Sequence, residues 1–472
     1  MSEYKATIGI EVHVEVKSNT KLFSNSKNTY GMPTNTCVNP IDLGYPGTFP
    51  TLNKEVIRQG IKACKVLHCD ISKVMHFDRK NYFYPDNPKN YQITQNRTPI
   101  GRNGYIEIEV DGQKKKIEIE EMHIEEDTCK SAHRGEISLL DFNRAGVPLI
   151  EIVTKPCISS SEEAMKYLEK LKETLFYANI SDCKMEEGSM RCDANVSISK
   201  TDTLGVKTEI KNIGSIHNVG LSIDKEIARH KELLEKGETL QVETRRFDSK
   251  KNDTVLMRVK ETGNDYRYFP EPDIPYLYLA DEMIEEAIKE IPLLPDELRS
   301  LYKEKGIKES QIEKLISNRS FSSFFTELIK EDTDYKIAAN LLLGDIASYL
   351  NRTRKDLGDT TITVKRLVSL IAHLSDGSLS MNNIKDLIDT FLETDKSVEE
   401  IMKEKNIQNI KDDSLIKDII ARVIANNEES VNDYKSGHDR ALKYLMGQVM
   451  KESKGQVNPS LANKLLQEEL EK

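Results

Sequence analysis

The sequence predicts a strand-rich α/β (α+β) region at the N-terminus, then an all-α domain and a small helical tail. Alternation of apolar and polar residues recurs up to about residue 275, and apolar residues at helical spacing follow from about residue 280. Pro292 and Pro295 interrupt the pattern between these regions, and the lysine- and asparagine-rich stretch 403–412 suggests a second boundary. The expected domains are 1–292, 293–405 and 406–472.

The first strand is expected at 7–17, where strict alternation places Glu11, His13 and Glu15 on the polar face. An Asp111-Gly112 turn indicates a hairpin over 105–126. Further strands are expected at 147–154, 190–199, 206–213 and 254–261, and helices at 54–67, 160–177 and 219–236. Ser159, Ser160 and Ser161 are candidate caps of the second of these helices.

The remainder of the chain is predicted to be helical. Helices are expected at 281–290, 296–305, 309–315, 321–330, 334–351 and 364–374, and in the tail at 414–426, 429–436, 438–453 and 459–470.

Composition limits the class of protein. A length of 472 residues suits two or three domains, and no apolar run approaches the roughly 20 residues of a membrane-spanning helix. The N-terminus has neither a signal-peptide nor a transit-peptide pattern, and the seven cysteines form no CxxC pair. These features predict a cytoplasmic protein with reduced thiols. The net charge of −10 means that any RNA must bind through local basic patches and shape.

Several predicted strands carry charged residues on one face. Glu151 is a lone carboxylate in an apolar strand, which is costly to bury without a partner. Two other strands place these residues on one face each: Arg191, Asp193, Asn195 and Ser197, and Lys207, Glu209 and Lys211. A solvated outer face is the alternative for each strand alone. Together they favour a polar cavity.

A change of parity in the apolar residues of the hairpin's return strand predicts a bulge near Glu120-Glu121, and bulges often occur beside active sites. His123, Glu125, Glu126 and Asp127 follow it. Carboxylates with one imidazole and no paired cysteines favour a hard ion such as Mg²⁺, and Mg²⁺ beside Lys and Arg is typical of phosphoryl transfer. The chain has no P-loop, no GxGxxG loop and no motif for an activated nucleophile. The residues alone therefore indicate metal-assisted phosphate chemistry of another design.

The same strands resemble a known family, the B subunits of the aspartyl/glutamyl-tRNA amidotransferases. The resemblance spans essentially the whole chain, and the tail is similar to the YqeY-like domain of that family. The motifs that carry it are IGIEVH (8–13), FDRKNYFYPDNPKNYQIT (77–94), HIEEDTCKS (123–131), DFNRAGVPLIEIV (141–153), MEEGSMRCDANVS (185–197) and DYRYFPEPD (265–273).

The resemblance implies a catalytic cradle domain that repairs misacylated tRNA, as a ligase with glutamine as the amido donor. ATP would phosphorylate the side-chain carboxylate of Glu-tRNA(Gln) or Asp-tRNA(Asn). Ammonia released by a separate amidase (A) subunit would then displace the phosphate, and a small C subunit would complete a heterotrimer. Because the glutaminase step belongs to the partner, the missing nucleophile fits this expectation.

The resemblance also implies site residues. One Mg²⁺ is assigned to His13, Glu125 and Glu151, and a second to Glu11, Asp193 and Glu209; which acid binds which ion stays open. Candidate phosphate contacts are Arg79, Lys80 and Lys207, and candidates for stacking on the terminal adenosine of tRNA are Tyr82, Tyr84 and Tyr91. Solvated charge and ordinary packing are the respective alternatives. Candidate tRNA contacts in the tail are Lys435, Arg440, Lys443, Lys451 and Lys454, where a solvated helix face is the alternative.

Some members of the family bind zinc through four cysteines near the first strand. The equivalent positions here are Ser24, Ser26, Asn39 and Asp42, which are poor zinc ligands as a set, so no structural zinc is expected.

Two other classes of protein stay open. In a non-catalytic tRNA-binding scaffold the acidic strands would be structural. An unrelated metal-dependent phosphatase or nuclease would explain the acids but not the long motifs. The sequence is compatible with Glu-tRNA(Gln), Asp-tRNA(Asn) or both as the substrate.

Overall fold

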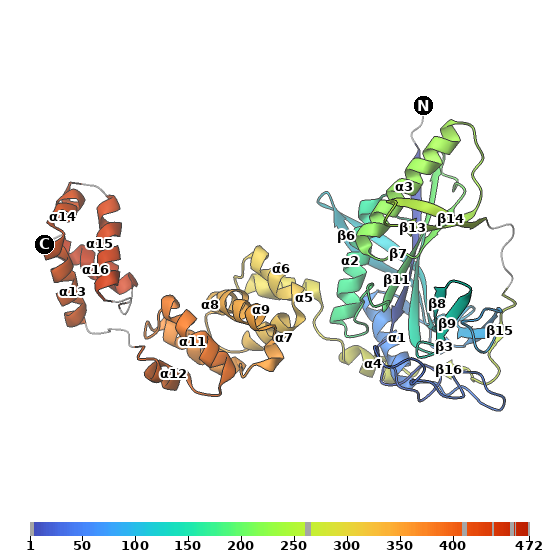
Figure 1. The fold of residues 1–472 in the computed structure, drawn as a ribbon, viewed down its shortest axis with the longest axis horizontal. Helices are drawn as coiled ribbons and strands as arrows, with labels where there is room; N and C mark the ends of the chain where they lie inside the picture. The colour runs from blue at the N-terminus through green and yellow to red at the C-terminus, as the bar shows by residue number, and fades with distance from the viewer. Residues whose placement is uncertain are drawn as a thin grey trace. The chain divides into compact units, whose positions relative to one another are not determined.

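A computed structural model describes residues 4–259, 266–407, 413–436, 439–453, 457 and 459–470. The chain forms two compact units, Met1–Leu294 and Pro295–Lys472. Figure 1 shows the elements of both units. The strand-rich first unit and the helical second unit confirm the predicted fold class.

The first unit is organised around a nine-stranded sheet with the strand order β14-β13-β12-β11-β1-β10-β7-β6-β2. Its strands pair antiparallel, except that β12 and β13 are parallel. Their bounds are β1 Lys5–Glu15, β2 Asp70–Ile71, β6 Gly101–Val110, β7 Gln113–Glu126, β10 Pro148–Thr154, β11 Met190–Ser199, β12 Thr208–Lys211, β13 Glu243–Asp248 and β14 Asp253–Val259.

Three small sheets accompany the large one: β15-β4-β5, β16-β3 and the hairpin β8-β9. Their strands are β3 Val74–Met75, β4 Asp78–Asn81, β5 Tyr91–Thr94, β8 Lys130–Arg134, β9 Ile137–Asp141, β15 Phe269–Pro270 and β16 Leu277–Tyr278. None of these seven strands was predicted from the sequence, nor were β2 and β13. Most of them are short, and the partner strands of β15 and β16 lie far away in the chain, so local alternation does not reveal them.

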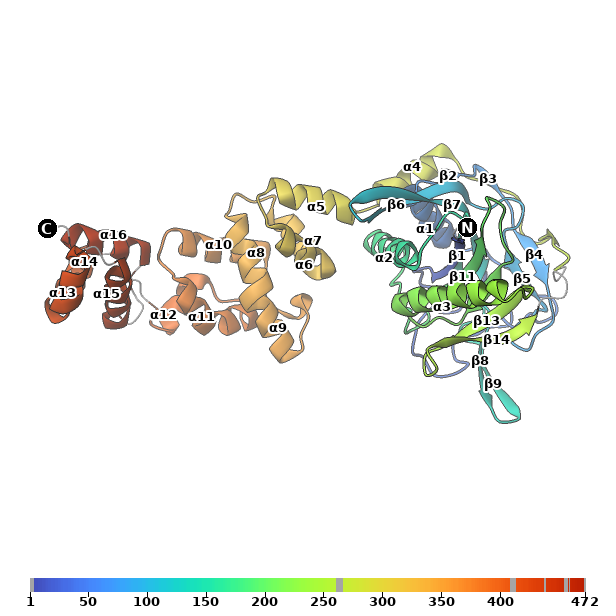
Figure 2. The ribbon, with the colours of Figure 1, turned by 90° about the horizontal axis from the view of Figure 1, so that it is seen from above.

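Helices α1 (Lys54–Val66), α2 (Ser161–Tyr177) and α3 (Ile216–Glu235) pack on one face of the large sheet, as Figure 2 shows from above. Ser160 caps α2 by accepting a hydrogen bond from the backbone of Glu163, which confirms one of the three candidate caps. Gly220 lets α3 approach α2 closely, because a Cβ atom there would lie 2.5 Å from the sulfur of Met165. The helices and the alternate residues of the strands form one apolar core.

The predicted bulge is present in β7. Glu121 pairs with Val153 of β10 and Ile119 pairs with Thr154, so Glu120 is the extra residue. This insertion shifts the side-chain alternation by one position, which turns the residues after it to the opposite parity. As a result His123 and Glu125 share the polar face of the sheet with Glu151.

The second unit is all-α, as expected. After α4 (Asp281–Lys289) of the first unit, its helices are α5 Pro295–Glu304, α6 Glu309–Ser317, α7 Arg319–Leu328, α8 Tyr335–Leu341, α9 Ala347–Thr353, α10 Val364–Ser375, α11 Met381–Glu393 and α12 Val398–Glu404. The single helix predicted over 334–351 is divided by a π-helical turn at Leu342–Ile346. Helices α11 and α12 were not predicted.

The tail contains α13 Asp413–Asn426, α14 Glu428–Lys435, α15 Asp439–Glu452 and α16 Pro459–Leu470, close to the predicted bounds. Ile416, Ile420, Leu445, Val449 and Leu466 belong to a core of its own. The chain divides after Leu294, and the finer division at 405 stays a prediction. None of the helices in the described ranges has the length and apolar character needed to cross a lipid bilayer.

Candidate active site

The acidic and imidazole side chains singled out in the sequence lie on one face of the large sheet, across the adjacent strands β12, β11, β1, β10 and β7. Residues paired directly in antiparallel strands project to the same face. His13 pairs with Glu151, and Glu11 pairs with Asp193. The other face of these strands carries the apolar residues that pack under the helices.

The first group consists of His13, Glu125 and Glu151, each of which offers a ligand atom within 4.8 Å of the others. Nε2 of His13 lies 3.4 Å from Oε1 of Glu125 and 3.5 Å from Oε2 of Glu151. Glu125 is buried and also accepts a hydrogen bond of 2.9 Å from the hydroxyl of Thr94 on β5. Two carboxylates and one imidazole fit a hard divalent cation such as Mg²⁺.

His123 lies beside this group and was not among the predicted site residues. Its Nε2 is 2.8 Å from Oε2 of Glu151 and 3.7 Å from Oε2 of Glu125. Burial alone would lower the pKa of His123, but the charge of Glu151 and hydrogen bonds to Glu125 and Glu151 raise it to about 10. An imidazolium at this position holds the two carboxylates together and ionised. The bulge was the signal that could have identified it, since it places His123 and Glu125 on one face.

The second group consists of Glu11, Asp193 and Glu209, again with ligand atoms within 4.8 Å of one another. Neutral donors orient two of them: Nδ2 of Asn195 donates to Glu11 at 2.8 Å, and the hydroxyl of Thr244 on β13 donates to Glu209 at 2.9 Å. Burial and the neighbouring charge of Glu151 raise the pKa of Glu11. A raised carboxyl pKa in a group of three acids indicates a need for positive charge.

Lys211 on β12 supplies a positive charge to the second group. Its Nζ lies 2.5 Å from Oδ2 of Asp193 and 3.1 Å from Oε1 of Glu209. The sequence placed Lys211 on the polar face of its strand but did not assign it to the site. Lys207, which was assigned, precedes the first residue of β12 and is exposed.

A cavity of about 370 Å³ adjoins both groups. His13, Glu125, Asp193 and Lys211 line it together with Lys80 of β4 and Arg191 of β11. Burial alone would lower the pKa of Lys80, and the charge of Glu125 raises it above its ordinary value. The cavity is therefore an acid-lined hollow with cationic side chains at its edge, a combination suited to binding phosphate beside a metal ion.

Two of the predicted phosphate contacts do not line this cavity. The guanidinium of Arg79 is bound to Glu271 by two hydrogen bonds of 2.6 and 3.0 Å and to Asp273 at 3.1 Å, and it lies over the ring of Tyr91. Arg79 thus ties β4 to the segment that follows β15. The phosphate contacts predicted for Arg79 and Lys207 gain no support from these positions, whereas Lys80 lies where the prediction needs it.

Of the three tyrosines predicted to stack on the tRNA, only Tyr82 lines the cavity. Tyr82 lines the cavity and meets the ring of Tyr266 edge to face at 6.2 Å. Tyr84 is 56% exposed and does not line it. Tyr91 packs against Arg79. Tyr82 is therefore the aromatic residue best placed to contact a ligand in the cavity.

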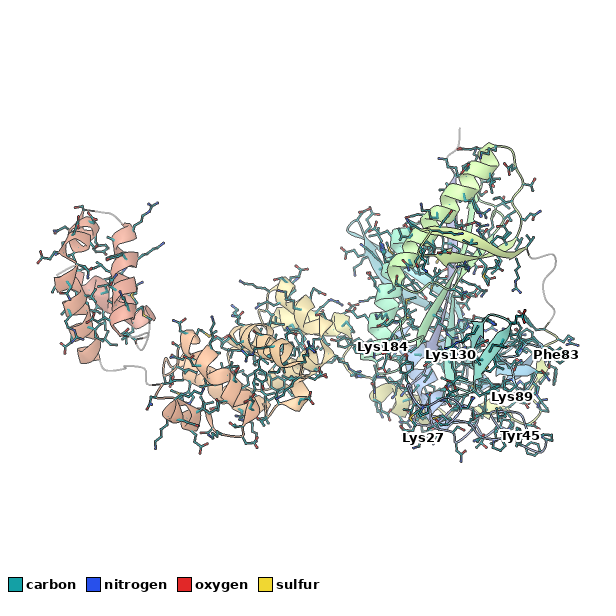
Figure 3. The ribbon with its side chains drawn as sticks, viewed as in Figure 1. Lys27, Tyr45, Phe83, Lys89, Lys130 and Lys184 are labelled. Atoms are coloured by element: carbon teal, nitrogen blue, oxygen red, sulfur yellow. The ribbon has the colours of Figure 1, made fainter. Side chains whose placement is uncertain are left out.

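The remaining acids of the HIEED run are paired elsewhere. Glu126 is buried, contacts the ammonium of Lys89, which Figure 3 labels, and accepts a hydrogen bond from the backbone of Ile93. Asp127 pairs with Arg191 and Arg144. All seven cysteines are free, five of them buried and two half-buried, which agrees with the expectation of reduced thiols.

The four positions considered for zinc, Ser24, Ser26, Asn39 and Asp42, form a hydrogen-bonded cluster. Asp42 accepts hydrogen bonds of 2.6 Å from the hydroxyls of Ser24 and Ser26 and of 3.0 Å from the backbone of Asn39. The ammonium of Lys21, which is fully buried, lies 3.2 Å from the same carboxylate. These side chains satisfy one another's hydrogen bonds and charge, and the absence of structural zinc stays a prediction.

In the tail, Lys435, Arg440, Lys443 and Lys451 are exposed, and Lys454 lies outside the described residues. Exposure fits either a solvated face or an RNA contact, so the predicted tRNA contacts stay a prediction.

Comparison with known proteins places this fold and site in a class. Residues 6–285 match the family model of the GatB/GatE catalytic domain, and residues 323–470 match that of the GatB domain. The first range contains both acidic groups and the cavity. The class is therefore that of GatB-type catalytic proteins.

Relatives along the full chain define the family more closely. The chain is 48% identical to the B subunit of the aspartyl/glutamyl-tRNA(Asn/Gln) amidotransferase of Geobacillus kaustophilus and 47% identical to that of Geobacillus thermodenitrificans, over 99% of each chain. It is 46% identical to the B subunit from Lysinibacillus sphaericus, again over 99% of both chains. The chain belongs to the family of aspartyl/glutamyl-tRNA(Asn/Gln) amidotransferase B subunits. Membership of this family makes it one component of a multi-subunit enzyme.

Proposed function

We propose that this chain activates the side-chain carboxylate of Glu-tRNA(Gln), Asp-tRNA(Asn) or both by ATP-dependent phosphorylation, and that ammonia then displaces the phosphate to form the amide. The observation that carries the proposal is the pair of acidic groups beside one cationic cavity, on five adjacent strands of a GatB-type fold. Activating a carboxylate with ATP brings two anions together, which requires positive charge between them. The acidic groups can bind cations, and the cavity beside them is lined by cationic side chains.

The residues fit two divalent cations. His13, Glu125 and Glu151 would hold one Mg²⁺, and Glu11, Asp193 and Glu209 would hold a second. Mg²⁺, when bound, neutralises phosphate charge and orients the transferring group. The donor chemistry supports this assignment, because both groups consist of carboxylate oxygens with at most one imidazole.

The chain's own side chains have separable tasks in this proposal. Lys80 and Arg191, at the edge of the cavity, would orient the phosphates and the substrate carboxylate. Thr94 and His123 keep Glu125 and Glu151 in position, and Tyr82 offers a ring for the 3′ end of the tRNA. No step calls for a covalent nucleophile of this chain, in agreement with the free and largely buried cysteines.

Ammonia would come from an amidase subunit, with a small third subunit completing a heterotrimer in the cytoplasm. The relatives are named as subunits of an amidotransferase, which supports the need for partners. The test uses the assembled enzyme with ATP, Mg²⁺ and misacylated tRNA, in the absence of glutamine and ammonia. ADP formation is expected with Glu-tRNA(Gln) or Asp-tRNA(Asn), and should stop when Mg²⁺ is chelated. ADP formed equally with correctly charged Gln-tRNA(Gln) would contradict the proposal.

The exposed basic residues of the tail are proposed as contacts to the tRNA backbone. Replacing Lys435, Arg440, Lys443 and Lys451 by Gln, one at a time, is expected to reduce the steepness of log K against log salt by about one for each lost phosphate contact. Binding is measured with full-length enzyme and tRNA over a salt series. Lys417→Gln and Lys464→Gln, exposed tail lysines outside the set, are matched controls. Equal slopes in all variants would exclude the tail as an RNA contact.

A further inference from the structure

Lys211 is positioned where a divalent cation of the second group would bind. Its ammonium contacts Asp193 at 2.5 Å and Glu209 at 3.1 Å, so it uses two of the three carboxylates of that group. A divalent ion requires direct bonds to the same oxygens at roughly 2.0 to 2.6 Å. Two cations cannot share these oxygens at such distances, because their mutual repulsion adds to the loss of ligand positions.

The side chain of Lys211 has room to leave. It is 33% exposed and lines the cavity of about 370 Å³ that adjoins the group. A lysine stem has four flexible carbons and a compact ammonium, so rotation of the stem moves the charge away from the carboxylates and into the cavity. There the ammonium would join Lys80 and Arg191, which also line the cavity.

The first group has no such arrangement. Its resident cation is His123, a short ring that is buried at 9% exposure and lies beside Glu151 rather than between the cavity and the acids. His123 does not line the cavity. His123 contacts one carboxylate of the first group at 2.8 Å, whereas Lys211 contacts two of the three carboxylates of the second group and also lines the cavity.

We propose that Lys211 is a displaceable counter-ion: without nucleotide it neutralises the second acidic group, and a divalent cation that enters with ATP displaces its ammonium onto the phosphates. Lys211 thereby becomes a phosphate contact only when the second ion is bound. This inference rests on the proposed two-cation site. The second ion and the nucleotide therefore bind cooperatively. The ion releases the ammonium of Lys211 to the phosphates, and the phosphates keep that ammonium away from the carboxylates that bind the ion.

The test measures Mn²⁺ binding to the assembled enzyme by electron paramagnetic resonance, with and without a non-hydrolysable ATP analogue. In Lys211→Met the second Mn²⁺ is expected to bind about tenfold more tightly without nucleotide, because the competing charge is gone. The analogue should tighten that ion strongly in the natural protein and much less in the variant. The KM for ATP should rise in the variant, because the phosphates lose a contact.

Matched variants separate the possible outcomes. Lys250→Met, at an exposed lysine between β13 and β14, is expected to leave both Mn²⁺ affinities unchanged. Asp193→Asn should abolish the second Mn²⁺; one ion bound in both the natural protein and Asp193→Asn would overturn the two-cation site itself. With two ions bound, an unchanged second affinity in Lys211→Met would overturn the role of Lys211 alone. Should Lys211→Met fail to fold, Lys211→Gln carries the same measurement, since its amide still donates to one carboxylate.

Discussion

Glu125→Gln is expected to lower tRNA-dependent ADP formation about 10³-fold, because a loss of several kcal/mol of charge stabilisation corresponds to about that factor. Glu125 is buried, lies 3.4 Å from His13, and is ionised: burial alone would raise its pKa, but hydrogen bonds from His123 and His13 hold it well below the usual range. The amide keeps the shape and the contact with Thr94 but removes the charge that a cation needs.

Two measurements accompany the Glu125 variant. The first Mn²⁺ should be lost from the binding titration, and circular dichroism should show an intact fold. Glu120→Gln is the matched control, since Glu120 belongs to the same strand but is exposed at the bulge. ADP formation within about threefold of the natural rate would remove Glu125 from the catalytic site and favour a non-catalytic scaffold.

Glu226→Gln is expected to destabilise the first unit by about 3–5 kcal/mol, the usual cost of removing one partner from a buried charge network. Glu226 on α3 is fully buried, contacts Arg229, lies 3.1 Å from Nε2 of His230 and 3.5 Å from Nε of Arg245, and accepts a hydrogen bond from Thr254. The amide would remove the buried charge that Arg229 and Arg245 share and leave Glu243, at 3.2 and 2.9 Å, as their remaining carboxylate partner.

Hydrogen-exchange mass spectrometry on the full chain measures this effect locally. Peptides from α3, β13 and β14 should exchange faster in Glu226→Gln, and peptides from the helical tail should not change. Glu235→Gln, at an exposed position of the same helix, is the control and should alter the exchange by less than about 0.5 kcal/mol. Unchanged protection of α3 in Glu226→Gln would mean that the network does not stabilise the fold.

Glu226 should also make the stability of the folded state depend on pH. Burial alone would raise the pKa of Glu226, but hydrogen bonds from His230 and Arg229 lower it from 4.5 to about 2. One pKa unit corresponds to about 1.4 kcal/mol, so the lowered pKa of Glu226 contributes about 3 kcal/mol to the free energy of unfolding. A lowered pKa favours the folded state above pH 4.5, and the contribution is lost as the pH falls toward 2. The difference in the free energy of unfolding between the natural protein and Glu226→Gln should therefore disappear as the pH falls from 4.5 toward 2.

Local sequence rules predicted much of this molecule. Strict alternation located β1, and the parity change located the bulge at Glu120, because the side-chain period of a strand is a local property. A serine followed by acids located the start of α2. The six acidic and imidazole residues assigned through the family resemblance lie in the two groups expected, although their role as metal ligands stays a prediction.

The cations of the site were not decided by local pattern. The alternation of residues places Lys207 and Lys211 on the same face of the predicted strand. In the structure only Lys211 lies within β12, and its ammonium contacts Asp193 on the neighbouring strand β11. Arg79 reads as a free basic residue, but the chain returns through β15 and supplies Glu271 as its partner. These charged partners are far apart in the sequence, and the pairing of the strands brings them into contact.

Local patterns were enough to predict the strand-rich and helical regions, the bulge, and the acid-bearing faces of the strands, because each depends on residues within a few positions of one another. The tertiary structure alone decided which cations neutralise those acids and that Glu226, an ordinary helical glutamate in the sequence, is fully buried. The physical reason is that the charge state of a carboxylate depends on groups within about 4 to 6 Å in space, whatever their separation along the chain.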